Sequence, residues 1–123
     1  MNKYNIGNRE MGFKAWDKKK KEMTLNDSFY ELQRWNRAED ELRDFVIMQY
    51  TGLKGENENK IYEGDIVEYS DEEDDEPCIV IYKQEACAFF TIGAYSGDVG
   101  EILPGKMKII GNVFENPNLL KDE

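Results

Sequence analysis

Short apolar runs separated by glycines and polar turns recur along the chain, and this pattern predicts strands rather than long helices. The run Phe45 to Gly52 is continuously rich in β-forming residues and ends at glycine, which indicates a buried strand. Two further strands, Ile79 to Tyr82 and Ala86 to Ile92, are expected around the polar turn KQE. A last strand, KMKIIGNVF, is interrupted by Gly111. Short strands with glycine corners are typical of a small, strongly bent sheet or an SH3-like barrel.

The N-terminal third of the chain and the C-terminal segment predict further strands and only a little helix. The segment Met11 to Leu25 predicts a strand, a lysine-rich turn and a second strand, and Ser28 to Trp35 alternates in polarity like a half-buried strand. A variant of the capping box, followed by apolar residues at helical spacing, predicts a short helix from about Arg37 to Asp44. Near the C-terminus, Asn116 or Pro117 is expected to open a helical turn. The expected fold is therefore mainly β, with one short helix and a C-terminal helical turn.

The segment IYEGDIVEY, residues 61 to 69, predicts a strand, a corner and a second strand. Gly64 is expected to take a positive φ, and the Asp65 side chain to accept backbone N–H bonds in the turn. In the second strand, the face with Val67 and Tyr69 is expected to be the core face, and Ile66 lies on the other. Gly52 and Gly111 are interpreted as further structural corners.

A chemical interpretation of the same segment competes with the structural one. Glu63 and Asp65 could form an acid–base pair or a divalent-cation site, which would require further carboxylates or oxygen ligands at set positions. We favour the corner, because the glycine–aspartate pair stands where the chain must turn between two apolar runs. No catalytic residue is assigned.

Length and charge narrow the class of protein. The chain has 123 residues, which favours a single domain over residues 1–123, and 34% charged residues give it a generous polar surface. The net charge is −10, and more than half of it falls in the run Asp71 to Glu76, which is interpreted as a solvated loop. A chain this acidic is expected to be repelled by nucleic acids and anionic membranes unless a local basic patch dominates. With no apolar run able to span a bilayer and no secretory h-region, we expect a cytoplasmic protein.

The residue inventory excludes several chemistries. There is no histidine, so Ser-His, Cys-His and His-metal mechanisms are excluded, and the glycine-rich loop GAYSGDVGE lacks the Lys-Ser/Thr of a phosphate-binding loop. Two cysteines without histidine do not make a zinc site. A hairpin turning near Gln84 would set Cys78 opposite about Phe90 and Cys87 opposite about Ile81, too far apart for a disulfide. Both cysteines are interpreted as small strand hydrophobes, and no cofactor, metal or small-molecule ligand is expected.

Four motifs in order, FKAWDKKKKEM, MQYTGLK, IYEGDIVEY and IIGNVFENPNLL, resemble the YopX family of bacteriophage and prophage proteins. The resemblance covers almost the whole chain. This sequence departs from the family pattern at Lys14, where arginine is usual, in KGENENK, where a D-x-N-G type turn is usual, and in the six-acid run. The resemblance implies a mostly β fold and a phage or prophage origin in a bacterial host. It implies no reaction.

These observations favour a phage or prophage accessory protein that acts as a non-enzymatic interaction module, binding a host or phage protein or assembling with itself. Trp35 and Tyr62 are the aromatic residues expected at the surface as partner-binding anchors, while the other aromatics fill the core. Two alternatives stay open. One is a nucleic-acid-associated SH3-like module that uses the basic cluster, and the other is a metal-dependent hydrolase that uses Glu63, Asp65 and acids near Asp98 and Glu101. The basic cluster, interpreted first as a solvated hairpin tip, is Lys18, Lys19, Lys20 and Lys21.

Overall fold

The computed structural model describes residues 3, 7, 10–25, 45–69 and 76–121. Within these ranges the chain forms nine strands and two short 3-10 turns, η2 (Glu56–Glu58) and η3 (Pro117–Leu120). The strand predicted over Ser28 to Trp35 and the helix predicted from Arg37 to Asp44 lie outside the described residues. The strands are β1 (Phe13–Asp17), β2 (Glu22–Leu25), β3 (Phe45–Lys54), β4 (Lys60–Tyr62), β5 (Asp65–Tyr69), β6 (Cys78–Lys83), β7 (Ala88–Gly93), β8 (Val99–Gly100) and β9 (Met107–Asn112).

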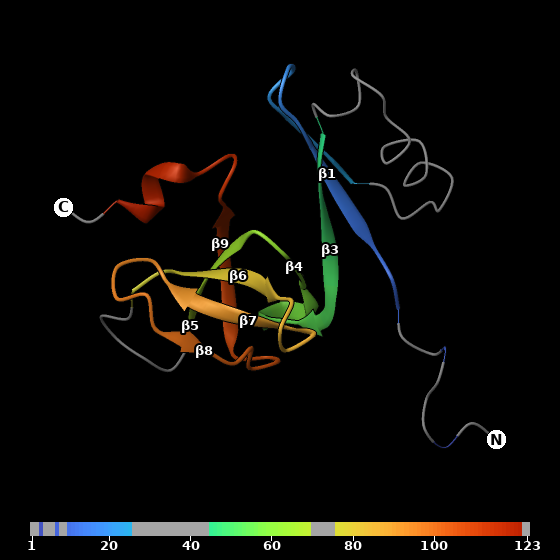
Figure 1. Ribbon diagram of the computed structural model, residues 1–123, viewed down its shortest axis with the longest axis vertical. Coiled ribbons are helices and arrows are strands. Elements are labelled where there is room, and N and C mark those ends of the chain that lie inside the picture. The colour runs from blue at the N-terminus through green and yellow to red at the C-terminus, as the bar shows by residue number, and fades with distance from the viewer. Residues whose placement is uncertain (1–2, 4–6, 8–9, 26–44, 70–75, 122–123) are drawn as a thin grey trace.

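The strands form two sheets in which every neighbouring pair is antiparallel. One sheet has the order β2-β1-β3-β4, and the other has the order β8-β7-β6-β5-β9. Figure 1 shows the first sheet standing upright at the right and the second sheet strongly curled, like half of a barrel, beside its lower end. The expectation of a mainly β, strongly bent fold is confirmed, and η3 confirms the predicted C-terminal helical turn.

The predicted hairpin around the four lysines is also confirmed. β1 and β2 pair from Lys14 with Leu25 to Asp17 with Glu22. The Asp17 carboxylate accepts the backbone N–H groups of Lys19 and Lys20, at 2.9 Å and 3.1 Å. This side-chain bond satisfies the amides of the turn and leaves the lysine side chains in solvent.

β3 runs two residues beyond the expected end at Gly52. Its pairing with β4 is regular at Tyr50 and again at Lys54, and the register shifts between them. Gly52 lies in this irregular stretch with a φ of +88°, a conformation that glycine adopts without steric cost. Gly52 therefore lies within β3 instead of ending it, and the pairing with β4 resumes at Lys54 after the irregular stretch.

The main core lies inside the curled sheet. Val67 of β5 is fully buried and Tyr69 packs against the core cluster, which confirms the predicted core face, and Ile66 on the other face is also 0% exposed. β5 begins where the chain passes from one sheet to the other, and both of its faces are covered there. The buried cluster consists of Ile61, Val67, Cys78, Val80, Ile102 and Met107, with Tyr69, Phe89 and Ile109 packed against it.

The two sheets are joined by the corner between β4 and β5, which contains only Glu63 and Gly64. The Glu63 N–H donates to the Gln49 carbonyl of β3 at 2.9 Å. The Gly64 N–H donates to the Val80 carbonyl of β6 at 2.8 Å, and the Gly64 carbonyl accepts the Val113 N–H at 2.9 Å. Two residues are thus hydrogen-bonded to both sheets and to the segment that follows β9.

Side-chain packing reinforces this junction. Trp16 of β1 stacks on Phe114, just beyond β9, with ring centroids 5.5 Å apart. At Gly64, φ is +86°, and a Cβ added there would lie 3.3 Å from the Met48 sulfur and 3.7 Å from a Val113 methyl carbon. The position therefore needs glycine for its backbone conformation and for the close approach of side chains from both sheets.

Replacing Gly64 with alanine is expected to destabilise the fold by more than the cost of positive φ alone. Gly97→Ala is the matched control, because Gly97 has a φ of +73° with nothing within 4 Å of the added Cβ. The control is expected to lose about 1 kcal/mol, and Gly64→Ala is expected to lose more because Met48 must also move. Urea unfolding followed by circular dichroism gives both values. A loss at Gly64 no larger than that at Gly97 would contradict the role assigned to the corner.

Candidate functional site

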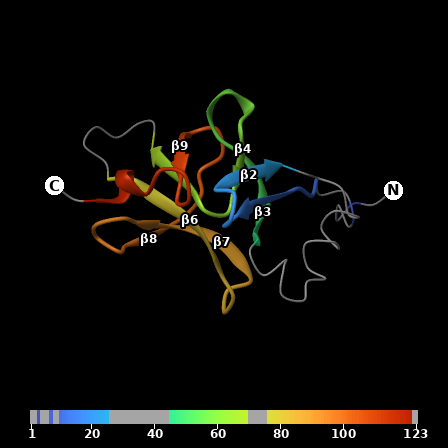
Figure 2. The ribbon, with the colours of Figure 1, turned by 90° about the horizontal axis from the view of Figure 1, so that it is seen from above.

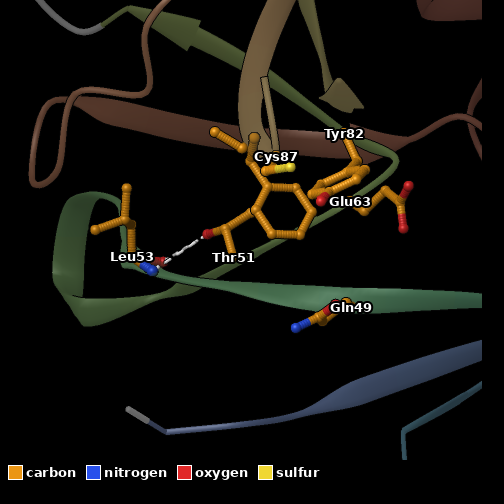
Figure 3. A pocket seen from close by; sticks show the side chains of 8 residues that line it. Gln49, Thr51, Leu53, Glu63, Tyr82 and Cys87 are labelled. Carbon is orange, nitrogen blue, oxygen red and sulfur yellow. Dashed lines mark hydrogen bonds between the residues drawn. The ribbon is translucent and has the colours of Figure 1, made fainter. Parts of the chain in front are cut away.

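A hollow lies between β3 and the hairpin of β6 and β7. It has a volume of about 600 Å³. Figure 2 shows the turn end of this hairpin extending away from the other strands, and Figure 3 shows the hollow from close by, with β3 along one side and hairpin residues along the other. We call it the hairpin groove. It is lined by Gln49, Thr51 and Leu53 of β3, Glu63 of the corner, and Tyr82, Cys87, Ala88 and Phe89 of the hairpin.

The hairpin wall of the groove is aromatic. Tyr82 and Phe89 lie opposite each other in the β6–β7 ladder and pack edge to face, with ring centroids 5.1 Å apart. Two residues further in, Val80 and Thr91 form the next pair on the same face and are buried. Because the hairpin extends beyond the core, the face that is covered at Val80 is open at Tyr82, whose side chain is 44% exposed.

The β3 wall is held in place by its own hydrogen bonds. The Thr51 hydroxyl donates to the Ile61 carbonyl of β4 at 2.8 Å and accepts the Leu53 N–H at 3.2 Å. These bonds span the irregular stretch around Gly52, where the strand ladder is interrupted. Leu53 is 36% exposed and adds an aliphatic side chain to the groove. Both walls are therefore formed before anything binds, which lowers the ordering cost of binding.

Glu63 connects the groove to a second, more apolar hollow of about 380 Å³. Glu63 and Tyr82 line both hollows, and the second one continues between the sheets past Met48 and Ile79 to Val113. The Glu63 side chain is partly exposed, and among the described residues it makes no ion pair. It is thus a carboxylate with solvent access, held by the rigid corner at the meeting point of two apolar surfaces.

Asp65 is the buried carboxylate of the corner. It is 4% exposed, and its Oδ2 accepts the Tyr62 N–H at 2.8 Å. Burial raises the pKa of Asp65 to about 6, although the Tyr62 N–H and the nearby Lys14 ammonium act in the opposite direction. The effect of desolvation on this pKa exceeds the effect of both contacts, because a charged carboxylate loses most of its hydration when it is buried. Asp65 does not line the hairpin groove.

The last acid of the acidic run, Glu76, has a structural role. Its carboxylate accepts the Ser96 hydroxyl, and it also accepts the N–H groups of Tyr95 and Ser96 at 3.0 Å and 2.9 Å. The Ser96 hydroxyl and these amides lower the pKa of Glu76. The expectation of a solvated loop does not describe Glu76, because its side chain closes the turn after β7. Residues 70–75 lie outside the described residues.

The structure separates the predicted partner-binding residues. Lys18 to Lys21 stand at the exposed tip of the β1–β2 hairpin, and Trp35 lies outside the described residues. Tyr62 was expected at the surface but is only 3% exposed, so that expectation was wrong. Its ring packs against Tyr50, its partner in β3, with centroids 5.5 Å apart, and the Lys14 ammonium lies 4.2 Å from its centroid.

The four predicted corner residues differ in conformation. Gly52 and Gly64 have φ values of +88° and +86°, and Asp65 begins β5. Gly111 lies within β9, does not have a positive φ, and is paired with Ile66. A Cβ added to Gly111 would meet the Asn116 side chain at 2.5 Å, so the position requires glycine for close packing.

The two cysteines also differ from each other. Both are free. Cys78 is a buried strand residue, as expected, but Cys87 is exposed in the β6–β7 turn with a φ of +53° and lines the hairpin groove. The expected register was wrong, because the turn includes four residues and sets Cys78 opposite Gly93.

Sequence reasoning missed the groove because its residues look like core residues. Phe89 had been assigned to the core, and Tyr82 is simply the end of an apolar strand. The alternation of Val80 with Tyr82 on one face, next to a polar turn, was the available signal. It shows a core-like face continuing to the end of a hairpin, but the sequence does not show where the core stops.

The described ranges contain no cluster of three or more His, Cys, Asp or Glu side chains that could hold a metal ion. In the same part of the chain, no helix has the length and apolar character needed to span a bilayer.

Asp65→Asn is expected to change how stability depends on pH. An acid whose pKa is raised by folding holds its proton more tightly in the folded state. The stability linked to Asp65 is therefore complete below its ordinary pKa of 3.8 and is lost as the pH rises through about 6. Asparagine retains an acceptor for the Tyr62 N–H and does not ionise. Between pH 4 and pH 7 the variant should gain up to roughly 3 kcal/mol over the wild type.

Urea unfolding at a series of pH values measures this difference, in which the contributions of the other acids cancel. The control is Gly97→Ala, which removes no ionisable group, so its difference from the wild type should not vary with pH. A constant difference for Asp65→Asn, or one that favours the wild type as pH rises, would refute the assigned pKa.

Comparison with known proteins places this arrangement in a family. The family model described as YopX protein matches residues 12–121. A solved structure, the crystal structure of protein EF1440 from Enterococcus faecalis, shares the fold with a TM-score of 0.62 and 24% sequence identity, covering 91% of this chain and 99% of that one. No curated protein matches the sequence. The match over residues 12–121 includes β1, both sheets, the corner and the hairpin groove, and the chain belongs to the YopX family.

Proposed function

We propose that this YopX-family protein is a non-enzymatic interaction module that binds a protein partner in the hairpin groove. The observation that carries the proposal is the aromatic pair Tyr82 and Phe89, where a core-like face continues past the core and forms one wall of a preformed hollow. Exposed aromatic side chains in a concave, rigid surface are common anchors in protein interfaces. Two hairpin residues that line the groove, Tyr82 and Cys87, are exposed to solvent.

The distribution of charged residues favours this function over the two alternatives. In the metal-dependent hydrolase, Glu63 and Asp65 would act together, yet Glu63 lines the groove whereas Asp65 is 4% exposed and bound to the Tyr62 amide. In the nucleic-acid module, Lys18 to Lys21 would bind phosphates. These lysines lie at the tip of a different hairpin, and none of them lines the groove.

The wider setting is part of the same proposal. First, the protein is an accessory protein of a phage or prophage and acts in the cytoplasm of a bacterial host. Second, residues 1–123 form one domain. The family match supports the first element, because the four motifs that resemble the phage and prophage family all fall within the matched residues. The family match over 110 consecutive residues supports the second.

A photo-crosslinking experiment tests the groove as the binding site. Tyr82 is replaced by p-benzoylphenylalanine in the bacterial host, and the control carries the same group at Val99, which is 50% exposed on β8 and does not line the groove. Position 82 is expected to give a dominant adduct with one protein, and position 99 is not. The captured protein, once purified, should bind Tyr82→Ser roughly tenfold or more weakly than the wild type, and Val99→Ser about as well as the wild type.

Equal adducts from both positions, or unchanged affinity in Tyr82→Ser, would reject the groove as the interface. If no adduct forms and native mass spectrometry of the purified chain shows only monomer, the interaction function itself fails.

A further inference from the structure

We propose that the partner binds as an added β-strand along the open edge of β7, through an extended segment that combines a large apolar side chain with a lysine or arginine. This inference rests on the proposed function and specifies the binding mode and the chemistry of the partner. In strand addition, backbone hydrogen bonds supply affinity, and pockets for alternate side chains supply specificity. The structure has both components side by side at the β6–β7 hairpin.

The first component is an edge that is only partly covered. β7 has six residues and pairs along its whole length with β6. On its other side it pairs only with the two residues of β8, at Thr91 and Ile92. Among the described residues, no strand pairs with that side of β7 at Phe89, which lies next to the hairpin turn.

The backbone groups that face this edge follow from the alternation of hydrogen bonds along a strand. The Gly93 N–H donates to the Asp98 carbonyl at 2.9 Å, on the β8 side. In an antiparallel strand every second residue directs its N–H and C=O to the same side. Thr91 and Phe89 therefore face the β8 side as well, and Phe90 faces β6. The N–H and C=O of Phe89 are the pair available to an added strand.

The second component is the groove directly beside this edge. The Phe89 side chain is on the groove face of β7, and an added strand would place every second side chain on that same face. A residue beside Phe89 would project toward the hollow between the hairpin and β3. The aromatic wall and Leu53 favour a large apolar side chain there.

The negative charge of this chain indicates that the partner segment is basic. Glu63 lines the groove and makes no ion pair among the described residues, and the net charge of the chain is −10. A basic side chain on the added strand would be attracted by Glu63 and by the overall field. The same field opposes a second copy of this chain on the edge. The observations therefore favour a basic, extended segment of another protein over self-pairing.

The test begins with a library of random twelve-residue peptides displayed and selected on the full chain. The enriched sequences are expected to place a large apolar residue and a lysine or arginine two positions apart, since this spacing puts both on one face of a strand. The best synthetic peptide then serves as the probe. Enrichment of acidic sequences, or of none, overturns the proposed partner chemistry.

Amide hydrogen exchange followed by NMR tests the strand addition. The peptide is expected to slow exchange of the Phe89 N–H by roughly tenfold or more. The Phe90 N–H, which already faces β6, is the matched control and should change little. A version of the peptide methylated on alternate backbone nitrogens should lose binding in one of the two alternation phases and keep it in the other. Binding without protection of Phe89, or equal effects of both methylated versions, overturns the edge pairing.

Substitution of Glu63 tests the charge selection. Glu63→Gln is expected to weaken peptide binding by about five- to tenfold and to reduce its dependence on salt. Glu22→Gln, the same change of charge on β2 and outside the groove, should change neither by more than about twofold. Equal effects of the two variants would mean that only the overall charge matters.

These results are distinguishable from failure of the proposed function. A specific adduct from position 82 without protection of Phe89 keeps the groove as an interface and removes the strand addition. If a higher concentration of the protein slows hydrogen exchange of the Phe89 N–H without any peptide, a second copy of the chain is the occupant. That result would overturn the basic partner.

Discussion

The arrangement of the whole molecule depends on a corner two residues long. Between β4 and β5, the backbones of Glu63 and Gly64 bond to β3, to β6 and to the segment after β9. Any other conformation of the corner would leave backbone groups of both sheets unpaired in a buried place, where each lost partner costs on the order of 1–3 kcal/mol. The positive φ of Gly64 is therefore set by the hydrogen bonds around it, and the relative position of the two sheets is set with it.

The same constraint creates the candidate site. The hairpin groove exists because the corner holds β3 opposite the β6–β7 hairpin, and one of the two corner residues, Glu63, lines it. Its sequence neighbour Asp65 is buried and shows the electrostatic cost of so tight a junction, as desolvation raises its pKa despite the bond from Tyr62. Two acids only two residues apart thus have different environments. Glu63 is partly exposed at the groove, and Asp65 is buried and accepts a hydrogen bond in the turn.

Local signals in the sequence predicted the local structure well. The lysine hairpin, the strand–corner–strand of residues 61 to 69 and the C-terminal turn all follow from turn residues and alternation. The errors have tertiary causes. Tyr62 is buried because Tyr50 of the neighbouring strand and Lys14 of β1 pack against its ring. Cys87 is exposed because the turn is longer than the three polar residues suggested. The groove could not be predicted, since it depends on how far a hairpin extends beyond a core assembled from distant segments.

The short length of β8 has a further consequence for the behaviour of the protein in concentrated solution. An uncovered strand edge is a template for aggregation as well as for recognition, and natural sheets usually protect such edges with charge, bulges or proline. Here β7 contains the apolar Phe89, which packs against Tyr82 of β6, and none of the six residues of β7 is charged. The abundance of carboxylates elsewhere in the chain then acts as colloidal protection, which keeps copies apart at neutral pH and weakens as acidification removes their charge.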